Sequence, residues 1–276
     1  MAAQKTPFLK MHGTGNDFVV LDGRKRAVSI DSASAKRIAD RHFGIGCDQL
    51  VVLGESKKAD VFMRIFNSDG SEISTCGNAS RCVADLLMRE GNVAQATIET
   101  AAGLLVGMRA EGDSVTIDMG EPKWEWRDVP LSESRNTLHL GIAEGLLMDP
   151  VAISMGNPHA IFFVRDLHHI RLGEWGPKLE HDRLFPQRAN ISAVQVVSPE
   201  YIKMAVWERG TGLTLACGSA ACAAVVAGVR REILERKVEV DLPGGRLSVE
   251  WRPGEGNGRV LMTGPVAYVF NGEIEL

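Results

Sequence analysis

The stretch NSDGSEISTCGNASRC, residues 67–82, decides the fold because LACGSAAC, residues 215–222, nearly repeats it. An offset of 141 residues relates the two stretches and also aligns the strand-like runs VFMRIFN and IKMAVWE that precede them. The residues paired by this offset are Cys76 with Cys217, Gly77 with Gly218, Asn78 with Ser219, Asn67 with Glu208, Gln49 with Asn190, and Asn16 with Asn157. Because these matches occur in one order along the chain, they indicate two homologous halves.

We predict an α/β (α+β) fold of two pseudo-symmetric halves, each a central helix wrapped by a mostly antiparallel or mixed β-sheet. The N-terminal half is expected to span residues 1–122, completed by a C-terminal strand at 266–276, and the other half residues 123–265. Alternating runs such as SVTIDM, KVEVDL and LSVEW predict strands, and LPGGRL predicts a hairpin turn. The halves join near EPKWEWRDVP at 121–130, and the active site is expected in the cleft between them.

Each cysteine of the repeated pair is expected just before a helix. Asn78 and Ser219 are residue types favoured at the N-cap, and each precedes a run of small and apolar residues. The first helix is predicted to end near Gly91, a natural C-terminal glycine. The second, from Ala220 to about Arg230, is apolar almost all round, which predicts a buried helix.

The composition indicates a protein with small-molecule partners. The 276 residues carry a net charge of −4 with a pI near 6.0, so no basic field attracts nucleic acid or an anionic membrane surface. The first ten residues, MAAQKTPFLK, lack the apolar core of a secretory signal, and no apolar run could span a bilayer. The five cysteines are an odd number, so reduced thiols and a cytoplasmic location are expected.

The position of the paired cysteines suggests acid–base chemistry. The N-terminus of a helix carries a partial positive charge and N–H groups without helical partners, which should lower the pKa of a thiol there and can hold a carboxylate. Two such thiols facing one carboxylate-bearing carbon could remove a proton from one face and return one to the other. This arrangement predicts a two-base racemase or epimerase.

The same segments resemble those of diaminopimelate epimerases, along essentially the whole chain. The resemblance rests on NSDGSEISTCGNASR, ERGTGLTLACGSAAC, KMHGTGNDFVVLD, GIGCDQL, SMGNPHA and RANI, which occur in the family's order and spacing. It implies the family's fold and the cofactor-independent interconversion of LL- and meso-diaminopimelate in lysine and peptidoglycan biosynthesis. Small departures at Ala79 and Ala220, where many members have glycine, are expected to leave activity intact.

The resemblance also implies residue roles. It makes Cys76 and Cys217 the acid–base pair, His159 and Glu208 the residues that tune the thiols, and Tyr268 a residue of a homodimer interface. The substrate contacts that it implies are Asn16, Gln49, Asn67, Gly77, Asn78, Asn157, Asn190, Glu208, Arg209, Gly218 and Ser219. No cofactor, metal, nucleic acid or membrane partner is expected.

Two alternatives remain open from the residues. A related two-cysteine racemase acting on proline or hydroxyproline would use the same thiols, although the Asn, Glu and Arg positions suit a second amino-acid head group. The other alternative is a non-isomerase thiol protein, either a redox switch or a metal-binding module. The spacing within the cysteine pairs does not match a zinc site. The remaining cysteines, Cys47, Cys82 and Cys222, are expected to be buried apolar residues.

Overall fold

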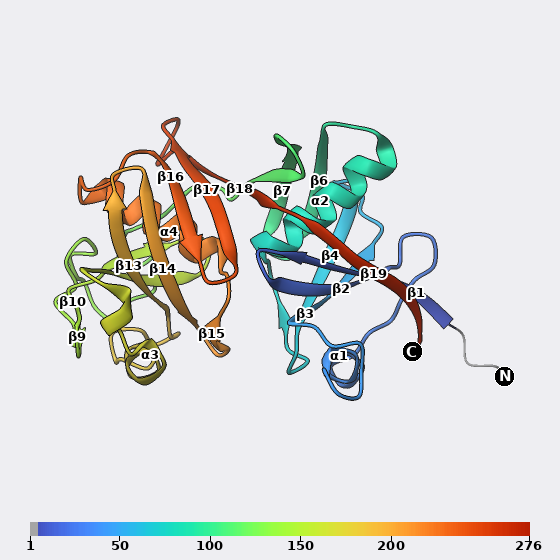
Figure 1. The fold of residues 1–276 in the computed structure, drawn as a ribbon, viewed down its shortest axis with the longest axis horizontal. Helices are drawn as coiled ribbons and strands as arrows, with labels where there is room; N and C mark the ends of the chain where they lie inside the picture. Colours follow the sequence, from blue (N-terminus) through green and yellow to red (C-terminus); the bar gives the residue numbers. More distant parts are fainter. Residues whose placement is uncertain (1–4) are drawn as a thin grey trace. The chain divides into compact units, whose positions relative to one another are not determined.

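Strands dominate both halves of the chain, and each half contains a long helix (Figure 1). The computed structural model describes residues 5–276, which divide into two units. The first unit contains the chain up to Ile117 together with Gly264–Leu276, and the second contains Asp118–Thr263. The sequence placed these boundaries a few residues further along. The predicted mixed α/β class is confirmed.

The first unit combines two helices with strands from both ends of the chain. In chain order its elements are β1 (Lys5–Gly13), β2 (Asn16–Asp22), α1 (Ser32–Ala39), β3 (Gln49–Gly54), β4 (Val61–Asn67), β5 (Glu72–Ile73), α2 (Gly77–Gly91), β6 (Gln95–Thr100), β7 (Gly103–Arg109), β8 (Ser114–Asp118) and β19 (Ala267–Glu275).

The elements from β9 to β18 follow in the second unit. They are β9 (Ala143–Glu144), β10 (Leu147–Met148), β11 (Val151–Ser154), β12 (Pro158–Val164), the short 3₁₀ helix η1 (Leu167–His169), α3 (Leu172–Glu180), β13 (Asn190–Ser198), β14 (Tyr201–Glu208), β15 (Gly212–Thr214), α4 (Gly218–Arg230), β16 (Lys237–Leu242), β17 (Gly245–Arg252) and β18 (Arg259–Pro265).

Parallel and antiparallel strand pairs follow the same order in each unit. In the first unit β2 pairs antiparallel with β1 and parallel with β3, and β4 pairs antiparallel with β3 and parallel with β6. Strands β6, β7 and β8 continue as antiparallel neighbours, while β19 joins β1. The second unit repeats this order through β11, β12, β13, β14, β16, β17 and β18.

The strand registers confirm the internal repeat. Residues that face each other in the first unit have counterparts, 141 positions later, that face each other in the second. Such pairs are Phe18–Gln49 and His159–Asn190 on the parallel strands, and Ile65–Ile73 and Val206–Thr214 on the antiparallel ones. A shift of one residue would turn every side chain to the opposite face of the sheet, so this agreement reflects a shared fold.

The long helices begin at the cysteines, which corrects one detail of the sequence prediction. Cys76 and Cys217 are themselves the N-cap residues, with extended backbone angles of φ −150°, ψ 116° and φ −129°, ψ 109°. Asn78 and Ser219, predicted to be the caps, lie inside the first turn of α2 and α4. The cap preference of Asn and Ser misled the prediction, because neither cysteine side chain makes a capping hydrogen bond and the backbone alone sets the helix start.

The far end of α2 uses asparagine where glycine was expected. Gly91 is the last helical residue, and Asn92 takes the left-handed conformation with φ 49°. Its backbone N–H donates to the carbonyl oxygen of Met88, which closes the last turn. Asparagine tolerates this conformation better than most residues do.

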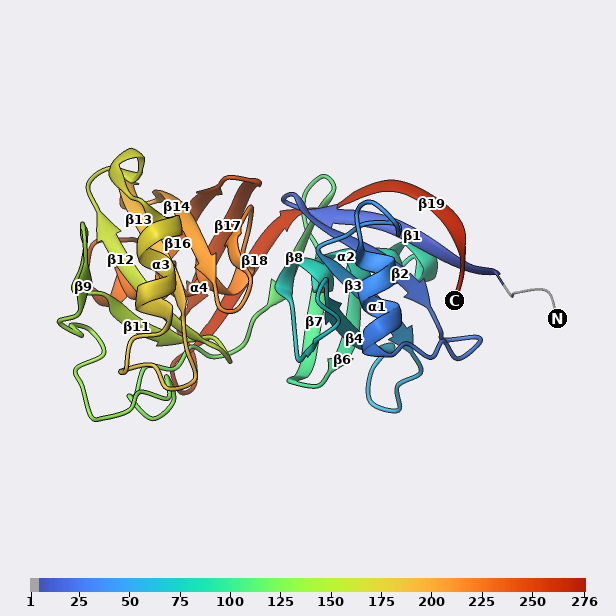
Figure 2. The ribbon, with the colours of Figure 1, turned by 90° about the horizontal axis from the view of Figure 1, so that it is seen from below.

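Burial is deepest around the two long helices. Helix α4 has a fully apolar interior from Ala220 to Ala227, and it lies against β11, β12 and β17. Helix α2 lies against β1, β6 and β7. The shorter helices α1 and α3 occupy equivalent places, α1 beside β3 and β4 and α3 beside β13 and β14 (Figure 2). The buried long helix predicted for the second half is confirmed.

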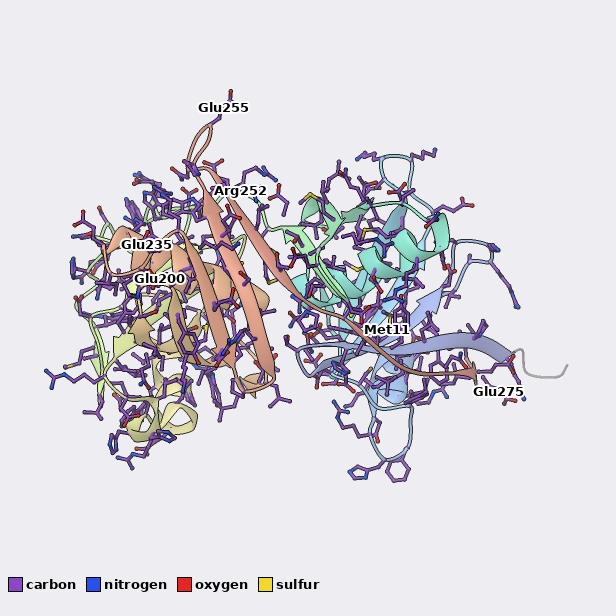
Figure 3. All side chains as sticks on the ribbon, turned by 45° about the horizontal axis from the view of Figure 1, so that its top comes forward. Met11, Glu200, Glu235, Arg252, Glu255 and Glu275 are labelled. Atoms are coloured by element: carbon purple, nitrogen blue, oxygen red, sulfur yellow. The ribbon has the colours of Figure 1, made fainter. Side chains whose placement is uncertain are left out.

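The acidic residues Glu255 and Glu275 lie on the surface. Met11 on β1 is fully buried, whereas Glu275 near the end of β19 is exposed (Figure 3). The loop between β17 and β18 carries Glu255 at its tip, with the side chain directed outward (Figure 3). Among the helices at residues 5–276, none has the length and apolar character needed to span a membrane.

A close contact between β7 and α2 gives a stability prediction. A Cβ atom added at Gly107 would lie 2.3 Å from the Cβ of Ala84, so Gly107→Ala should lower the free energy of unfolding by about 1–3 kcal/mol. Gly54→Ala is the matched control, since its Cβ would meet only the Phe62 carbonyl oxygen at 3.9 Å. Urea denaturation of both variants measures the difference, and equal stability would contradict this tight packing.

Candidate active site

The first half-site forms around the start of α2. Cys76 is partly buried, and its Sγ lies 3.8 Å from Oδ1 of Asn16, at the beginning of β2. The same oxygen accepts a hydrogen bond of 3.2 Å from Nδ2 of Asn78. Gly77 lies in the chain between Cys76 and Asn78, the two residues that contact Oδ1 of Asn16, and it is buried. The structure therefore brings Cys76, Asn16, Gly77 and Asn78 together.

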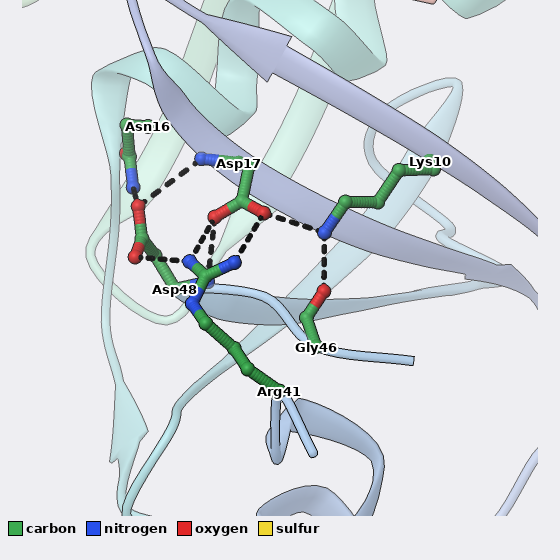
Figure 4. A network of polar contacts seen from close by, with 6 residues as sticks. All are labelled: Lys10, Asn16, Asp17, Arg41, Gly46 and Asp48. Carbon is green, nitrogen blue, oxygen red and sulfur yellow. Dashed lines mark hydrogen bonds and ion pairs between the residues drawn. The ribbon is translucent and has the colours of Figure 1, made fainter. Parts of the chain in front are cut away.

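Asn16 is held from behind by a network of charged residues (Figure 4). Its Nδ2 donates to Oδ2 of Asp48 at 3.0 Å, and Arg41 pairs with both Asp48 and Asp17 at 2.9 and 2.7 Å. Lys10, which is 7% exposed, completes the network with an ion pair of 2.5 Å to Asp17. These positive neighbours, together with backbone and side-chain hydrogen bonds, overcome partial burial and hold the pKa of Asp17 well below its usual range.

Gln49 and Asn67 face each other across β3 and β4. Nε2 of Gln49 donates to Oδ1 of Asn67 at 3.0 Å, and Nδ2 of Asn67 donates to Oγ of Ser71 at 3.2 Å. Oε1 of Gln49 is buried and has no hydrogen-bond partner within residues 5–276. A buried carbonyl oxygen of this kind can accept a hydrogen bond from an ammonium group.

The second half-site forms around the start of α4. Cys217 follows β15 and is 7% exposed, and its Sγ lies 3.5 Å from Oγ of Ser219. Nδ2 of Asn157 donates to this hydroxyl at 3.3 Å. Gly218, the first residue of α4, is buried beside them. Asn157 and Ser219 thus repeat the pairing of Asn16 and Asn78, one repeat length later in the chain.

His159 supports Asn157 from the interior. The imidazole is 0% exposed, and its Nε2 lies 2.9 Å from Oδ1 of Asn157. Burial and the nearby positive charge of Arg209 lower the pKa of His159 from 6.5 to about 3. The ring is therefore neutral at pH 7. Its Nδ1 has no hydrogen-bond partner among the described residues. A buried acceptor without a partner costs less free energy than a buried N–H group without one, so Nδ1 is unprotonated and Nε2 carries the proton.

The pKa of Cys217 departs from the sequence expectation. We expected the helix N-terminus to lower it, but the pKa of the Cys217 thiol is raised well above its ordinary value. Burial is the largest cause, and the negative charge of Glu208 is the next. Glu208 in turn accepts a 2.6 Å hydrogen bond from Oγ1 of Thr214 across β14 and β15. Cys217 therefore holds its proton at neutral pH in this structure.

Asn190 and Arg209 interact mainly with the backbone. Oδ1 of Asn190 accepts from the N–H of Arg209 at 2.9 Å, and its Nδ2 donates to the Pro158 carbonyl at 3.1 Å. The exposed Arg209 guanidinium donates to the carbonyl of Gln187 at 3.1 Å. Asn190 thus fixes the turn that follows Glu208.

Sequence reasoning missed two acidic residues that support these half-sites. Glu180, at the end of α3, is 3% exposed and accepts from Nε1 of Trp207 at 2.7 Å and the N–H of Gly210 at 3.0 Å. It anchors the turn that carries Glu208, and nothing in KLEHDR marks it as buried. Asp48 was overlooked although it directly precedes Gln49, and its adjacency to that residue was the available signal.

The other cysteines are buried, as expected. Burial raises the pKa of Cys47 to about 11 and that of Cys82 to about 12, so both remain protonated apolar side chains. Cys222 is fully buried within α4. Over residues 5–276, no group of three or more His, Cys, Asp or Glu side chains is arranged to hold a metal ion.

The sequence matches those of known proteins. The sequence model of the family described as diaminopimelate epimerase matches residues 8–125 and 151–269. The chain belongs to the diaminopimelate epimerase family. It is 53% identical over 275 residues to a diaminopimelate epimerase of Acidiphilium cryptum, with 100% of this chain and 98% of that protein covered. Membership of this family makes the protein an isomerase.

Solved structures share the fold at much lower identity. A phenazine biosynthesis protein of the PhzF family from Bacillus anthracis has a TM-score of 0.73 at 18% identity, covering 99% of this chain and 100% of that one. A hydroxyproline epimerase from Agrobacterium vitis has a TM-score of 0.72 at 17% identity, covering 100% and 94%. These likenesses show that the diaminopimelate epimerase-like fold also occurs in proteins with other names.

The buried His159 gives a pH prediction. Its folded-state pKa of about 3 lies below the ordinary 6.5, so below pH 6.5 the unfolded chain binds a proton that the folded chain does not. His159 therefore makes stability fall as the pH drops from 6.5 towards 3, by roughly 2 kcal/mol at pH 5. His159→Gln should remove this loss, and the exposed His168→Gln should retain it.

The measurement is urea denaturation of the three proteins at pH 7 and pH 5. An equal loss of stability in the native protein and in His159→Gln would show that His159 is not held neutral by burial.

Proposed function

We propose that the protein interconverts LL- and meso-diaminopimelate by a cofactor-independent two-base reaction, with Cys76 and Cys217 as the acid–base pair. The observation that carries the proposal is the repeated half-site: each unit of this family member places a cysteine at the N-cap of a buried helix, and an asparagine is hydrogen-bonded to the first turn of that helix. Such a reaction serves lysine and peptidoglycan biosynthesis in the cytoplasm.

The repeat suits a reaction that must run in both directions. One thiolate removes the proton from the α-carbon, and the other thiol returns a proton to the opposite face. This requires one thiol to be ionised and the other protonated when substrate binds. The raised pKa of Cys217 supports its assignment as the protonated thiol of the substrate-free enzyme. Each turnover leaves the first cysteine protonated and the second ionised. The enzyme is then ready to run the reaction in the reverse direction.

The helix starts supply the charge stabilisation that proton removal needs. The first backbone N–H groups of α2 and α4 have no acceptor within the helix, and the partial positive charge there favours a carboxylate. Gly77 with Asn78, and Gly218 with Ser219, are the residues that place these groups. As the α-proton leaves, negative charge spreads onto the carboxylate oxygens and strengthens these interactions.

The remaining polar residues suit the second head group of diaminopimelate. Glu208 offers a carboxylate to an ammonium group, and Arg209 offers an exposed guanidinium to a carboxylate. The unpartnered carbonyl oxygen of Gln49 and the amides of Asn67 and Asn157 add neutral contacts. His159 acts through Asn157, since its buried neutral ring fixes that amide. A proline-type substrate lacks a second charged head group and would leave these charges unmatched.

The test of this substrate is deuterium exchange in D2O. Purified reduced protein is incubated with LL-diaminopimelate, and with proline in a parallel tube, and the α-carbons are followed by NMR. Exchange at one centre of diaminopimelate with formation of the meso isomer is expected. Exchange into proline alone would replace the substrate assignment, and no exchange in either tube would contradict the proposed reaction.

Replacing either thiol should abolish the proposed reaction. Cys76→Ser and Cys217→Ser should each lower kcat by at least about a hundredfold, because a hydroxyl is a far weaker acid than a thiol. Cys82→Ser and Cys222→Ser are matched controls, since they make the same change at buried positions of the same helices. Conversion of LL-diaminopimelate followed by NMR compares the four variants, and unchanged turnover without Cys76 or Cys217 would refute the two-base assignment.

We also propose that the protein is a homodimer that uses β19. Three consecutive large side chains of this strand are exposed: Tyr268 by 40%, Val269 by 53% and Phe270 by 50%. A row of exposed apolar groups of this kind favours association. Tyr268 is held in place by Arg89, whose guanidinium lies 5.2 Å from its ring centroid.

The dimer gives a separate prediction. Tyr268→Ala should shift the protein towards monomer in size-exclusion chromatography with light scattering, because it removes an aromatic anchor from the strand. Val93→Ala is a control, since it truncates an exposed apolar residue on the loop after α2. A native protein that is monomeric at all concentrations, or a Tyr268→Ala protein that remains fully dimeric, would contradict the role of this residue.

A further inference from the structure

Asp48 lies behind Asn16 and directly precedes Gln49 at the start of β3. We propose that Asp48 is a positioning residue that sets the orientation of the Asn16 amide, so that its oxygen faces the Cys76 thiol. The direct contact is the hydrogen bond of 3.0 Å from Nδ2 of Asn16 to Oδ2 of Asp48. A carboxylate can only accept, so this contact admits the amide in one orientation.

Asp48 is itself held in place by two neighbours. Its Oδ1 accepts a 2.9 Å charge-assisted hydrogen bond from Arg41, and its Oδ2 also accepts from the N–H of Asp17 at 3.2 Å. In return, the N–H of Asp48 donates to Oδ1 of Asp17 at 2.9 Å. The loop before β3 and the start of β2 are thus tied together at Asn16 and Asp17 (Figure 4).

A buried cation fixes the rest of the network. Lys10 on β1 pairs with Oδ2 of Asp17 at 2.5 Å and donates to the Gly46 carbonyl, while Arg41 spans both oxygens of Asp17 at 2.7 and 3.1 Å. Two cations therefore balance the carboxylates of Asp17 and Asp48. Each charge in this network has an opposite partner, and Arg41 pairs with Asp17 as well as with Asp48, so the network favours a single geometry.

The alternative orientation of the Asn16 amide is unfavourable at both ends. A flipped amide would place its oxygen against the Asp48 carboxylate and its NH2 against Nδ2 of Asn78, which now donates to Oδ1 at 3.2 Å. Both hydrogen bonds would be replaced by contacts between groups of the same polarity. Asp48 on one side and Asn78 on the other therefore leave Oδ1 of Asn16 directed at Cys76, 3.8 Å away.

The second unit lacks this device. One repeat length after Asp17 and Asp48 the chain has Pro158 and Ala189, which offer no side-chain acceptor. There the equivalent Asn157 is held by its oxygen, through Nε2 of His159 at 2.9 Å, and directs its NH2 at Ser219. Asp48 thus explains why equivalent asparagines present opposite ends of their amides to the two half-sites.

The effect on the reaction rests on the proposed role of Cys76. In the direction in which Cys76 is the protonated thiol, a fixed acceptor beside it orients its S–H bond and prevents Asn16 from rotating to other partners. Asp48→Ala removes the acceptor from an exposed position, so the fold should be retained. We expect kcat/KM to fall on the order of tenfold to a hundredfold, the usual effect of losing a hydrogen bond to a charged group.

A double-mutant cycle separates positioning from a general effect of charge. In an Asn16→Ala background, Asp48→Ala should cause no further loss, because the amide that Asp48 positions is absent. Asp40→Ala is the matched control: it removes an exposed carboxylate from the connection between α1 and β3, where the Asp40 side chain accepts from the N–H groups of His42 and Phe43. Its kcat/KM should equal that of the native enzyme. An equal loss from Asp48→Ala in both backgrounds would overturn the proposal.

A spectroscopic readout keeps the inference independent of activity. In protein labelled with 15N-asparagine, the side-chain NH2 of Asn16 is identified by its disappearance in Asn16→Ala. One of its protons should be shifted downfield by the Asp48 carboxylate, and Asp48→Ala should abolish this shift while Asp40→Ala leaves it unchanged. If the native enzyme epimerises nothing, the proposed function fails but this shift still tests the positioning. An Asn16 signal unaffected by Asp48→Ala would overturn the positioning itself.

Discussion

The structure depends on the backbone conformation at the two cysteines. Each has extended angles and lies three residues after a short strand, β5 or β15, where it starts a buried helix. This places the sulfur beside the helix N-terminus, where an anion is favoured. In the first unit the sulfur also lies beside Asn16, and in the second Ser219 links Cys217 to Asn157. The strands wrap around the helices to maintain this geometry, and the identical registers of the two units preserve it in both.

The half-sites share a backbone but differ in their electrostatics. The first is supported by the ion-pair network of Lys10, Asp17, Arg41 and Asp48, whereas the second is supported by a buried neutral histidine and by Glu208. Burial outweighs the helix N-terminus at Cys217 and keeps its proton in place. A two-base reaction needs one ionised and one protonated thiol. Different surroundings of the two cysteines favour this difference in protonation.

Most of the fold could be predicted because the repeat is visible as residues in register. The offset that aligns Cys76 with Cys217 also aligns strand pairs, and it led to the correct fold class and helix positions. The predicted N-cap residues were wrong because the cap preference of Asn78 and Ser219 was given more weight than the extended backbone at the cysteines. The predicted direction of the Cys217 pKa shift was wrong because the burial that raises this pKa depends on tertiary packing, which the sequence does not show. Asp48 and Glu180 were missed because a carboxylate in a loop or at a helix end is usually solvent-exposed.

The most direct test of the two-thiol account is the origin of the proton in the first product formed. LL-diaminopimelate is converted in D2O by the native enzyme, and both isomers are analysed at less than about a tenth of conversion. Two bases predict that the meso product carries solvent deuterium at the inverted centre while unreacted substrate keeps protium. Product that retains the substrate's own proton would mean that a single base returns it, and would contradict the account.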